Sequence, residues 1–363
     1  MDKTADRNLF LVNTPMQLVN AVVLATTVCK EEKSDVYYTS NISDAVKSFV
    51  KDGIFTNGYE MQMPNDLCPR SNAITKALVR IKNALDLRWI IKHLPSDARL
   101  YKRVFLSGIN LKNCEFYYAI SKVNRRVELN LYEEGICEYT CYKKKSVSKA
   151  LFSYFFFGKF YLSSAKKMYV YMPELVKCAW ENIEILKLKL VRRDELVESF
   201  NRAFGYERTT LHDNKKVVIL EQEFYGVGEN EKQREIIDAI AKSVGEERIL
   251  IKLHPRAPRD KYGETYKTID IKAPFEVVAM NENVFENIFV SVSSSAILNL
   301  NFLFGENPNI IMLNRIFVTN PVDQERVDTF MADVKKLYVS ETFFVPETME
   351  ECINNIDCLV NKL

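Results

Sequence analysis

The sequence predicts an α/β protein with parallel sheets, organised in two domains. Short apolar runs alternate with longer segments of helical periodicity, which is typical of parallel α/β architecture. The chain has 363 residues, about twice the usual length of one domain. Apolar residues make up 47% and charged residues 27% of it, which is the composition of a globular protein rather than a disordered one.

The first half contains the elements of one Rossmann-like domain. Residues 9–12 are predicted to form a buried strand, and Pro15 begins a helix because proline suits the first helical turn. Further strands are expected at residues 35–39, 103–107 and 127–132.

The middle of the chain has a different composition. Residues 143–200 combine a lysine run, an aromatic cluster at 152–160 and a charged stretch from 173 to 200. We expect mostly helix there, serving as an insertion, an interdomain connection or an interaction surface.

The second half has the clearest alternation of strands and helices. Strands are predicted at 217–220, 249–253, 288–292 and 310–313, with an apolar helix at 296–304. In the helix predicted for 231–244, the branched residues Ile236, Ile237, Ile240 and Val244 share one face, and Gly245 ends the helix.

These elements predict two Rossmann-like domains that face each other across a central cleft. The expected bounds are 1–170 for the first domain, 171–212 for a helical connection and 213–340 for the second domain. A C-terminal helical segment at 341–363 could pack back on the first domain.

Composition excludes several classes of function. A net charge of +2 gives no general affinity for nucleic acid, and only 11 glycines argue against a P-loop or a glycine-rich dinucleotide motif. Eight cysteines without CxxC spacing and only three histidines predict neither a disulfide framework nor a zinc site. We therefore expect no metal and no cofactor.

The amino-terminal region carries no targeting signal that we can identify. Residues 1–8 are polar, and Asn13, Thr14, Pro15 and Gln17 interrupt the apolar stretch at 9–28, so no spanning helix is predicted. The expected location is the cytoplasm, with attachment to the inner face of the membrane left open.

Polar clusters follow five of the predicted strands. Ligands of parallel sheets bind outside the carboxyl ends of the strands. Those ends carry Asn13 and Thr14, then 133–135, 221–223, 254–256 and 293–295. Each cluster could also be a simple cap or turn.

Two of these clusters suit a phosphate group. A helix that begins at Ser294 or Ser295 offers backbone N–H groups and its positive end to an anion, although one serine could simply be the N-cap. His254 precedes Pro255, and a histidine pKa of about 6.5 suits proton donation, although a structural role is the alternative. Arg256 could bind phosphate or lie in solvent.

Glu133 and Glu134 precede a glycine at the end of a predicted strand. Neighbouring side chains on a strand point to opposite faces, so only one of the two can face a ligand and act as a general base. An acidic surface turn is the alternative. Together with the histidine and the serines, such a base describes group transfer from a phosphate-linked donor.

Four segments in this order resemble the bacterial sialyltransferases: 130–135, 253–256, 274–277 and 293–295. Residues 13–17 are similar to the start of glycosyltransferase family 52. Families 80 and 38, the latter containing polysialyltransferases, share the later motifs. The similarity spans most of the chain.

The resemblance implies a GT-B fold and the inverting, metal-independent transfer of sialic acid from CMP-Neu5Ac to a hydroxyl of a capsule or lipooligosaccharide glycan. By position, Glu134 is the general base with Glu133 as its neighbour, and His254 is the general acid. Both acidic positions are glutamate, where many relatives carry aspartate.

The resemblance also implies the binding residues. On the donor side these are Ser293, Ser294, Ser295, Pro255, Arg256 and Glu276. Which two serines hold the phosphate stays open. Glu276 would bind the cytosine amino group, or would be a glutamate at a helix N-terminus. On the acceptor side they are Asn13, Thr14, Gln17 and Gln222, and Gln222 is in doubt because residues 221–224 depart from the family 52 pattern.

Several alternatives remain at this point. The donor could be CMP-Kdo or a UDP-sugar, and a non-catalytic protein that binds sugar nucleotides is a further class. The segments 143–145 (lysine) and 155–157 (phenylalanine) fit contact with an anionic membrane, a solvated turn beside core phenylalanines, or a homodimer interface.

Overall fold

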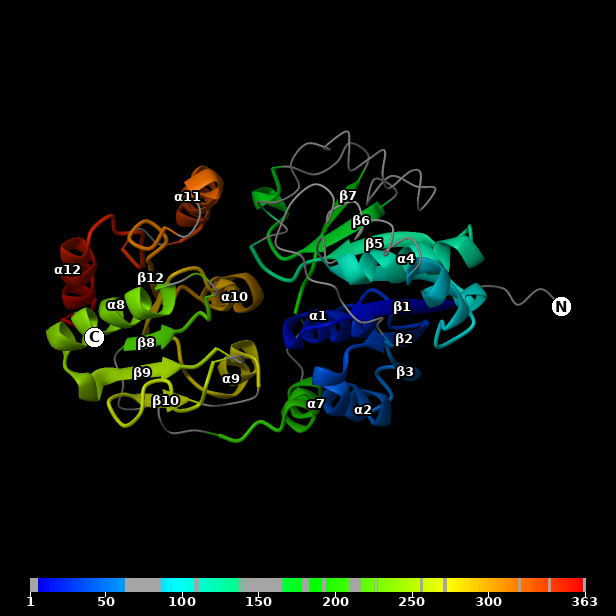
Figure 1. Ribbon diagram of the computed structural model, residues 1–363, viewed down its shortest axis with the longest axis horizontal. Coiled ribbons are helices and arrows are strands. Elements are labelled where there is room, and N and C mark those ends of the chain that lie inside the picture. The colour runs from blue at the N-terminus through cyan, green and yellow to red at the C-terminus, as the bar shows by residue number, and fades with distance from the viewer. Residues whose placement is uncertain are drawn as a thin grey trace. The chain divides into compact units, whose positions relative to one another are not determined.

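The computed structural model describes the residues 6–62, 86–107, 111–136, 139, 165–177, 183–190, 194–208, 217–224, 226, 228–254, 257–269, 273–318, 321–338 and 341–361. The chain divides into two compact units, Met1–Ala203 and Phe204–Leu363. Each unit is a parallel sheet with helices on it (Figure 1).

Among the described residues, the first unit has a seven-stranded sheet with the order β3-β2-β1-β4-β5-β6-β7. The strands are β1 (Arg7–Val12), β2 (Lys33–Tyr38), β3 (Asn57–Glu60), β4 (Tyr101–Ser107), β5 (Glu128–Tyr132), β6 (Ala165–Val170) and β7 (Glu184–Lys187). β1, β4 and β5 are almost fully buried, as strands covered on both faces are in parallel sheets.

The α-helices described in this unit are α1 (Pro15–Thr26), α2 (Ser43–Lys51), α4 (Leu111–Val123) and α7 (Asp194–Phe204). The 3-10 turns described in this unit are η1 (Ser40–Ile42), η2 (Ala98–Leu100) and η3 (Pro173–Leu175). Pro15 is the first residue of α1, as predicted, and Thr14 is the N-cap of this helix.

In the part of the chain that the structure describes, the second unit has a six-stranded sheet with the order β10-β9-β8-β11-β12-β13. Its strands are β8 (Val217–Leu220), β9 (Ile249–Lys252), β10 (Lys267–Ile269), β11 (Ile288–Ser291), β12 (Asn309–Met312) and β13 (Phe343–Phe344). Its helices are α8 (Glu229–Val244), α9 (Phe275–Asn281), α10 (Ser295–Phe304), α11 (Pro321–Lys335) and α12 (Met349–Val360), with the turn η4 (Glu246–Arg248).

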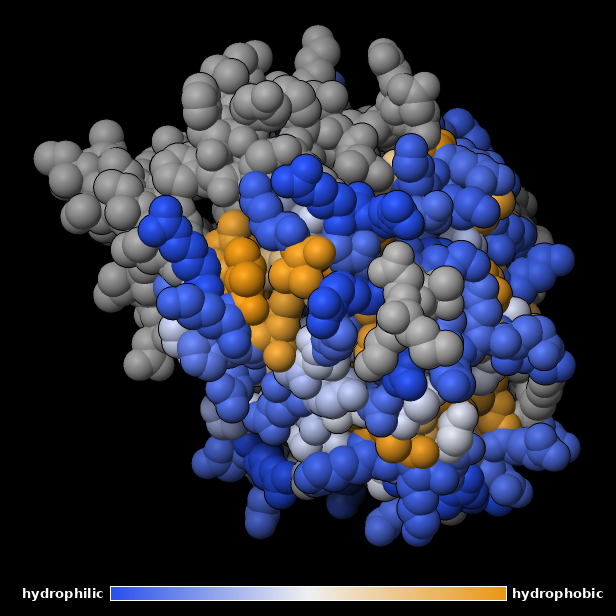
Figure 2. Space-filling model, turned by 90° about the vertical axis from the view of Figure 1, so that its right-hand side faces the viewer, coloured by the Kyte–Doolittle hydropathy of each residue, from blue (hydrophilic) through white to orange (hydrophobic). Residues whose placement is uncertain are grey.

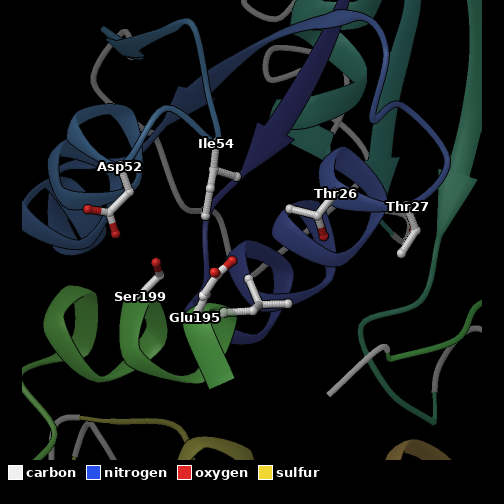
Figure 3. Close-up of a pocket in the computed structure, with 7 residues that line it drawn as sticks. Thr26, Thr27, Asp52, Ile54, Glu195 and Ser199 are labelled. Carbon is white, nitrogen blue, oxygen red and sulfur yellow. The ribbon is translucent and has the colours of Figure 1, made fainter. Parts of the chain in front are cut away.

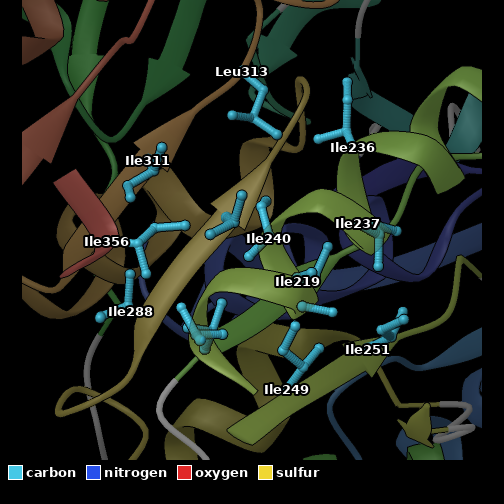
Figure 4. Packing of buried hydrophobic residues seen from close by; sticks show 14 of the residues in the cluster. Ile219, Ile236, Ile237, Ile240, Ile249, Ile251, Ile288, Ile311, Leu313 and Ile356 are labelled. Carbon is cyan, nitrogen blue, oxygen red and sulfur yellow. The ribbon is translucent and has the colours of Figure 1, made fainter. Parts of the chain in front are cut away.

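The core of the second unit is rich in isoleucine. Ile219 and Ile251 of the sheet pack in one buried cluster with Ile240 of α8 and Ile356 of α12 (Figure 4). β-branched residues fit a pleated sheet surface well, so this composition suits the covering of the sheet by two helices. Gly245 ends α8 with a φ of 93°, a backbone conformation that favours glycine.

Both sheets reverse their strand order beside their first strand. The chain moves outward in one direction from β1 to β3 and in the other from β4 to β7, and the second unit repeats this about β8 and β11. Successive loops diverge at such a switch point and leave room for a ligand at the carboxyl ends of the strands. The loops after β1, β4, β8 and β11 are therefore the first places to look for a site.

The predicted strands are present in both units, but the domain bounds need correction. The helical connection predicted at 171–212 is wrong, because β7 continues the first sheet, with Met168 of β6 paired to Ile185. α7 also belongs to the first unit. The ring of Phe200 packs edge-to-face on that of Phe49 of α2, with 5.6 Å between the ring centroids, and Arg202 Nη2 lies 2.9 Å from Asp52 Oδ2. The first unit thus extends to Ala203 rather than to residue 170.

α12 is the helix expected in the C-terminal segment, and it places Cys352, Ile356 and Leu359 in the core of the second unit. Packing of the segment 341–363 on the first domain stays a prediction. The lysines at 143–145 and the phenylalanines at 155–157 lie outside the described residues.

Hydrophilic side chains predominate on the face drawn in Figure 2, where apolar side chains gather in small separate patches. Among the helices that the structure describes, none is long and apolar enough to cross a membrane.

Ile240 tests the packing of the second unit. It is fully buried, so Ile240→Ala should lower the free energy of unfolding by about 2–5 kcal/mol, and Ile240→Val by only about 0.5–1.5 kcal/mol. Urea unfolding followed by circular dichroism measures both. Equal effects of the two substitutions would contradict the packing described.

Candidate active site

The carboxylate of Glu134 is held by the first turn of α1. Thr14 Oγ1 donates a hydrogen bond to its Oε1 at 2.8 Å, and Gln17 Nε2 donates one to its Oε2 at 2.6 Å. Ser107 Oγ lies 3.5 Å from the same Oε2. These residues follow or end β1, β4 and β5, which are neighbours in the sheet, so the site gathers at the switch point of the first unit.

Three predicted acceptor-side residues form one network around this carboxylate. Thr14 Oγ1 also accepts the backbone N–H of Gln17 at 3.2 Å, and Gln17 Oε1 accepts the N–H of Asn13 at 2.7 Å. The amide of Asn13 donates to Asn113 Oδ1 of α4 at 2.7 Å. Gln17 is fully buried and both ends of its amide are bonded within the protein, so it orients Glu134.

The positive end of α1 lies beside this carboxylate. Thr14 is the N-cap of the helix, and the first turn carries no acidic residue of its own. The helix dipole and two charge-assisted hydrogen bonds both stabilise a negative charge at Glu134. The same contacts hold the carboxylate in one direction, as a group that must meet a reacting hydroxyl requires.

Glu133 points away from Glu134 into the protein. Its carboxylate Oε2 accepts the N–H of Tyr171 at 2.8 Å and the hydroxyl of Tyr139, and its backbone carbonyl accepts from Asn20 Nδ2 at 2.6 Å. Burial raises the pKa of this carboxyl to about 7, against the effect of the two hydrogen bonds. The opposed directions of the two glutamates follow from strand geometry, and the contacts of Glu133 are structural.

In the second unit, His254 follows β9 and is half-buried. Its backbone N–H donates to Glu221 Oε2 at 2.9 Å. Glu221 follows β8, the neighbouring strand, and its side chain is fully buried. Pro255 and Arg256 lie outside the described residues.

The serine cluster forms the cap of α10. Ser294 is the N-cap, and its Oγ accepts the N–H of Ala296 at 3.3 Å. Ser291 Oγ, at the end of β11, accepts the N–H of Ser294 at 3.1 Å and donates to the carbonyl of Leu220 at 2.8 Å. Ser293 is exposed and Ser295 is the first residue of α10. Ser291 was not predicted from the sequence, and it ties this loop to β8 across the switch point.

Glu276 lies in the first turn of α9 and is buried. Its Oε1 accepts a hydrogen bond from Asn299 Nδ2 of α10 at 2.7 Å. Burial raises the pKa of this carboxyl, while the bond from Asn299 and the charge of Lys252 act in the opposite direction. These contacts link α9 to the helix that carries the serine cap.

The backbone of Gln222 is fixed by Gln233 of α8. Gln233 Oε1 accepts the N–H of Gln222 at 3.0 Å, and Gln233 Nε2 donates to its carbonyl at 2.8 Å. Gln222 therefore lies in a loop of the second unit whose backbone Gln233 holds, whereas Asn13, Thr14 and Gln17 belong to the first unit.

A cavity of about 230 Å3 lies elsewhere in the first unit (Figure 3). It is lined by Thr26, Thr27, Asp52, Ile54, Glu195, Leu196 and Ser199. Thr26 and Thr27 lie at the C-terminal end of α1, the end opposite to Thr14. No predicted site residue lines this cavity. Within the described ranges, no group of three histidine, cysteine, aspartate or glutamate side chains could hold a metal ion.

A family model described as alpha-2,8-polysialyltransferase matches residues 8–314 of the chain. The chain belongs to this polysialyltransferase family. The match runs from β1 to the end of β12 and so includes Glu134, His254 and the serine cap. It confirms the resemblance to sialyltransferases, and it makes this protein a glycosyltransferase. A search of curated proteins finds no match.

Solved structures resemble this polysialyltransferase family member in fold. Arabidopsis thaliana UGT89C1 in complex with UDP-L-rhamnose aligns with a TM-score of 0.55 at 13% identity, covering 99% of this chain and 90% of that one. A Listeria monocytogenes structure described as a UDP-N-acetylglucosamine 2-epimerase aligns with a TM-score of 0.54 at 10% identity, covering 98% and 88%. At such identities the likeness shows the fold alone, and it confirms the two-domain, Rossmann-like GT-B architecture.

Glu133 makes the stability of this protein depend on pH. Between pH 4.5 and about 7 the folded protein keeps the proton of Glu133 while the unfolded chain loses it, so this group's contribution falls as pH rises. Glu133→Gln does not ionise. Its stability relative to the wild type should therefore rise by up to about 3 kcal/mol between pH 4.5 and 8.

Urea unfolding of both proteins at pH 5 and pH 8 measures this difference. Glu60→Gln, at an exposed position on β3, is the control and should show no such change. A difference between Glu133→Gln and the wild type that is the same at both pH values would contradict the assignment.

Proposed function

We propose that this glycosyltransferase transfers sialic acid from CMP-Neu5Ac to a hydroxyl of an acceptor glycan of the capsule or lipooligosaccharide type. The observation that carries the proposal is the half-buried carboxylate of Glu134, held by Thr14 and Gln17 at the switch point of the first sheet. Membership of the polysialyltransferase family supports the sugar, and the serine-capped helix of the second unit suits a donor phosphate.

In this mechanism Glu134 is the general base. It takes the proton of the acceptor hydroxyl as that oxygen attacks the anomeric carbon of the sialic acid. The bond from this carbon to the phosphate oxygen of CMP breaks in the same displacement, so the configuration at the carbon inverts. Thr14 and Gln17 act on the reaction by fixing the direction of the carboxylate, and positioning of this kind contributes strongly to rate.

The leaving group is CMP, and His254 is proposed to donate a proton or hydrogen bond to its phosphate. The N–H groups at the start of α10 and the hydroxyls of Ser293 and Ser295 are proposed to bind the phosphate oxygens, with Ser294 in use as the cap. Binding of the cytosine by Glu276 is less well supported than the alternative of a structural glutamate, because its carboxylate already accepts from Asn299. Pro255 and Arg256 stay predictions on the donor side.

The proposal is tested first by the reaction itself. Purified protein is incubated with CMP-Neu5Ac and a panel of small glycans, and the products are followed by mass spectrometry. CMP-Kdo and UDP-sugars are the competing donors. We expect transfer from CMP-Neu5Ac, with activity retained in EDTA. Transfer from a UDP-sugar alone would overturn the donor assignment.

Two substitutions test the roles of the residues. Glu134→Gln removes the base and His254→Ala removes the acid, so each should lower kcat by at least about 100-fold. His93→Ala is the matched control, since His93 is exposed and stacks on Trp89. A rate like that of the wild type in either variant would remove the role assigned to that residue.

A further inference from the structure

We propose that Glu221 is the positioning residue of His254, and that Lys261 fixes Glu221. The inference rests on the proposed function, because it concerns the reaction in which His254 acts. Neither residue was singled out for this role by the sequence.

The paired strands β8 and β9 end shortly before His254. The register of β8 and β9 runs to Leu220 opposite Lys252, two residues before His254. The backbone N–H of Glu221 then donates to the carbonyl of Lys252 at 3.1 Å, and its carboxylate accepts the backbone N–H of His254 at 2.9 Å. On the other side, the N–H of Leu253 donates to Ile269 of β10 at 3.3 Å. Glu221 thus continues the hydrogen bonding beyond the end of β9 as far as His254.

A charge pair holds Glu221. Its Oε1 pairs with Lys261 Nζ, and the hydroxyl of Tyr262 lies 3.5 Å from the same oxygen. The side chain of Glu221 has no exposed surface, and that of Lys261 is 15% exposed. A buried carboxylate is unfavourable unless it is paired and hydrogen-bonded, and here each oxygen has a partner.

Lys261 is in turn held by two further groups. Glu223 Oε2 lies 2.8 Å from its Nζ, and Asn230 Oδ1 of α8 lies 3.1 Å from it. The ammonium group therefore keeps two partners when Glu221 is replaced. A substitution at Glu221 then leaves no unpaired charge at Lys261, so the variant should fold.

The geometry has a direct consequence for catalysis. His254 lies two residues after the end of β9, so the direction of its ring depends on the backbone at the end of that strand. Displacement of a reacting group by about 1 Å can lower a rate by about 100-fold. A carboxylate that fixes the N–H of the same residue limits such displacement.

The experiment compares two substitutions with a matched control. Glu221→Gln keeps an oxygen that can accept the His254 N–H, whereas Glu221→Met removes it. Glu223→Gln changes the other carboxylate on Lys261 and leaves the contact with His254 in place. We expect kcat to fall about 10-fold or more in Glu221→Met, and less than about 3-fold in the other two variants.

A second substitution separates positioning from a general loss of structure. If Glu221 acts through His254, Glu221→Met should change the residual rate of His254→Ala by less than about 3-fold, because effects of coupled residues do not add. An equal effect of Glu221→Met in both backgrounds, or a kcat within about 2-fold of the wild type, would overturn the inference.

A spectroscopic measurement makes the outcome independent of activity. The chain has only three histidines, so histidine labelled with 13C in the ring gives a simple NMR spectrum in which His254→Ala identifies one signal. Glu221→Met should shift or broaden that signal and leave the signal of His93 unchanged. If the wild type shows no sialyl transfer, the proposed function fails while this test stands. If transfer occurs and neither the signal nor kcat changes in Glu221→Met, the inference alone fails.

Discussion

In both sheets, all strand pairs that the structure describes are parallel, and the other features of the protein depend on this constraint. Parallel strands end at one edge, so short polar segments far apart in the sequence meet there. In the first unit this brings the residues after β5 to the start of α1. In the second it brings the residues after β8, β9 and β11 to neighbouring positions.

The two adjacent glutamates show how the same side chain takes different roles at such an edge. Glu133 is turned inward, loses its contact with solvent and is bonded to a tyrosine hydroxyl and a backbone N–H. Glu134 is turned toward the N-terminus of α1, where two polar side chains and the helix dipole stabilise its charge. Glu133 thus stabilises the end of β6, whereas the carboxylate of Glu134 lies beside the start of α1. Neighbouring side chains of an extended segment point in opposite directions, and this alternation gives the two glutamates their different roles.

The sequence allowed the prediction of those elements in which local and tertiary preferences agree. Residues 217–220 are branched and apolar and form β8 with those bounds, and Pro15 begins α1. β3 and β7 were missed because each has only four residues and lies at an edge of the sheet, where partial exposure imposes little apolar pattern. β13 was missed because it is only two residues long.

The residues of the candidate site likewise divide into those that could be predicted from the sequence and those that could not. Thr14 and the pair of Glu133 and Glu134 could be named from clusters at strand ends, since sheet geometry brings such clusters together. The choice of Glu134 and the addition of Gln17 came from the resemblance to the sialyltransferases. The ion pair of Glu221 with Lys261 could not be predicted from the sequence. The two residues are 40 positions apart, with α8 and β9 between them, and the pair depends on the burial of a charged side chain. Ser291 was missed because it lies within a strand, where a serine gives no signal of its own.

The central claim is that a single carboxylate of the first unit activates the acceptor for one direct displacement. NMR of the first product formed from CMP-Neu5Ac tests it most directly, because it gives the configuration of the anomeric carbon before any equilibration. The proposed mechanism predicts a product inverted relative to the donor. A first product with retained configuration would require two displacements and a covalent intermediate, and would contradict the role of Glu134 as the base.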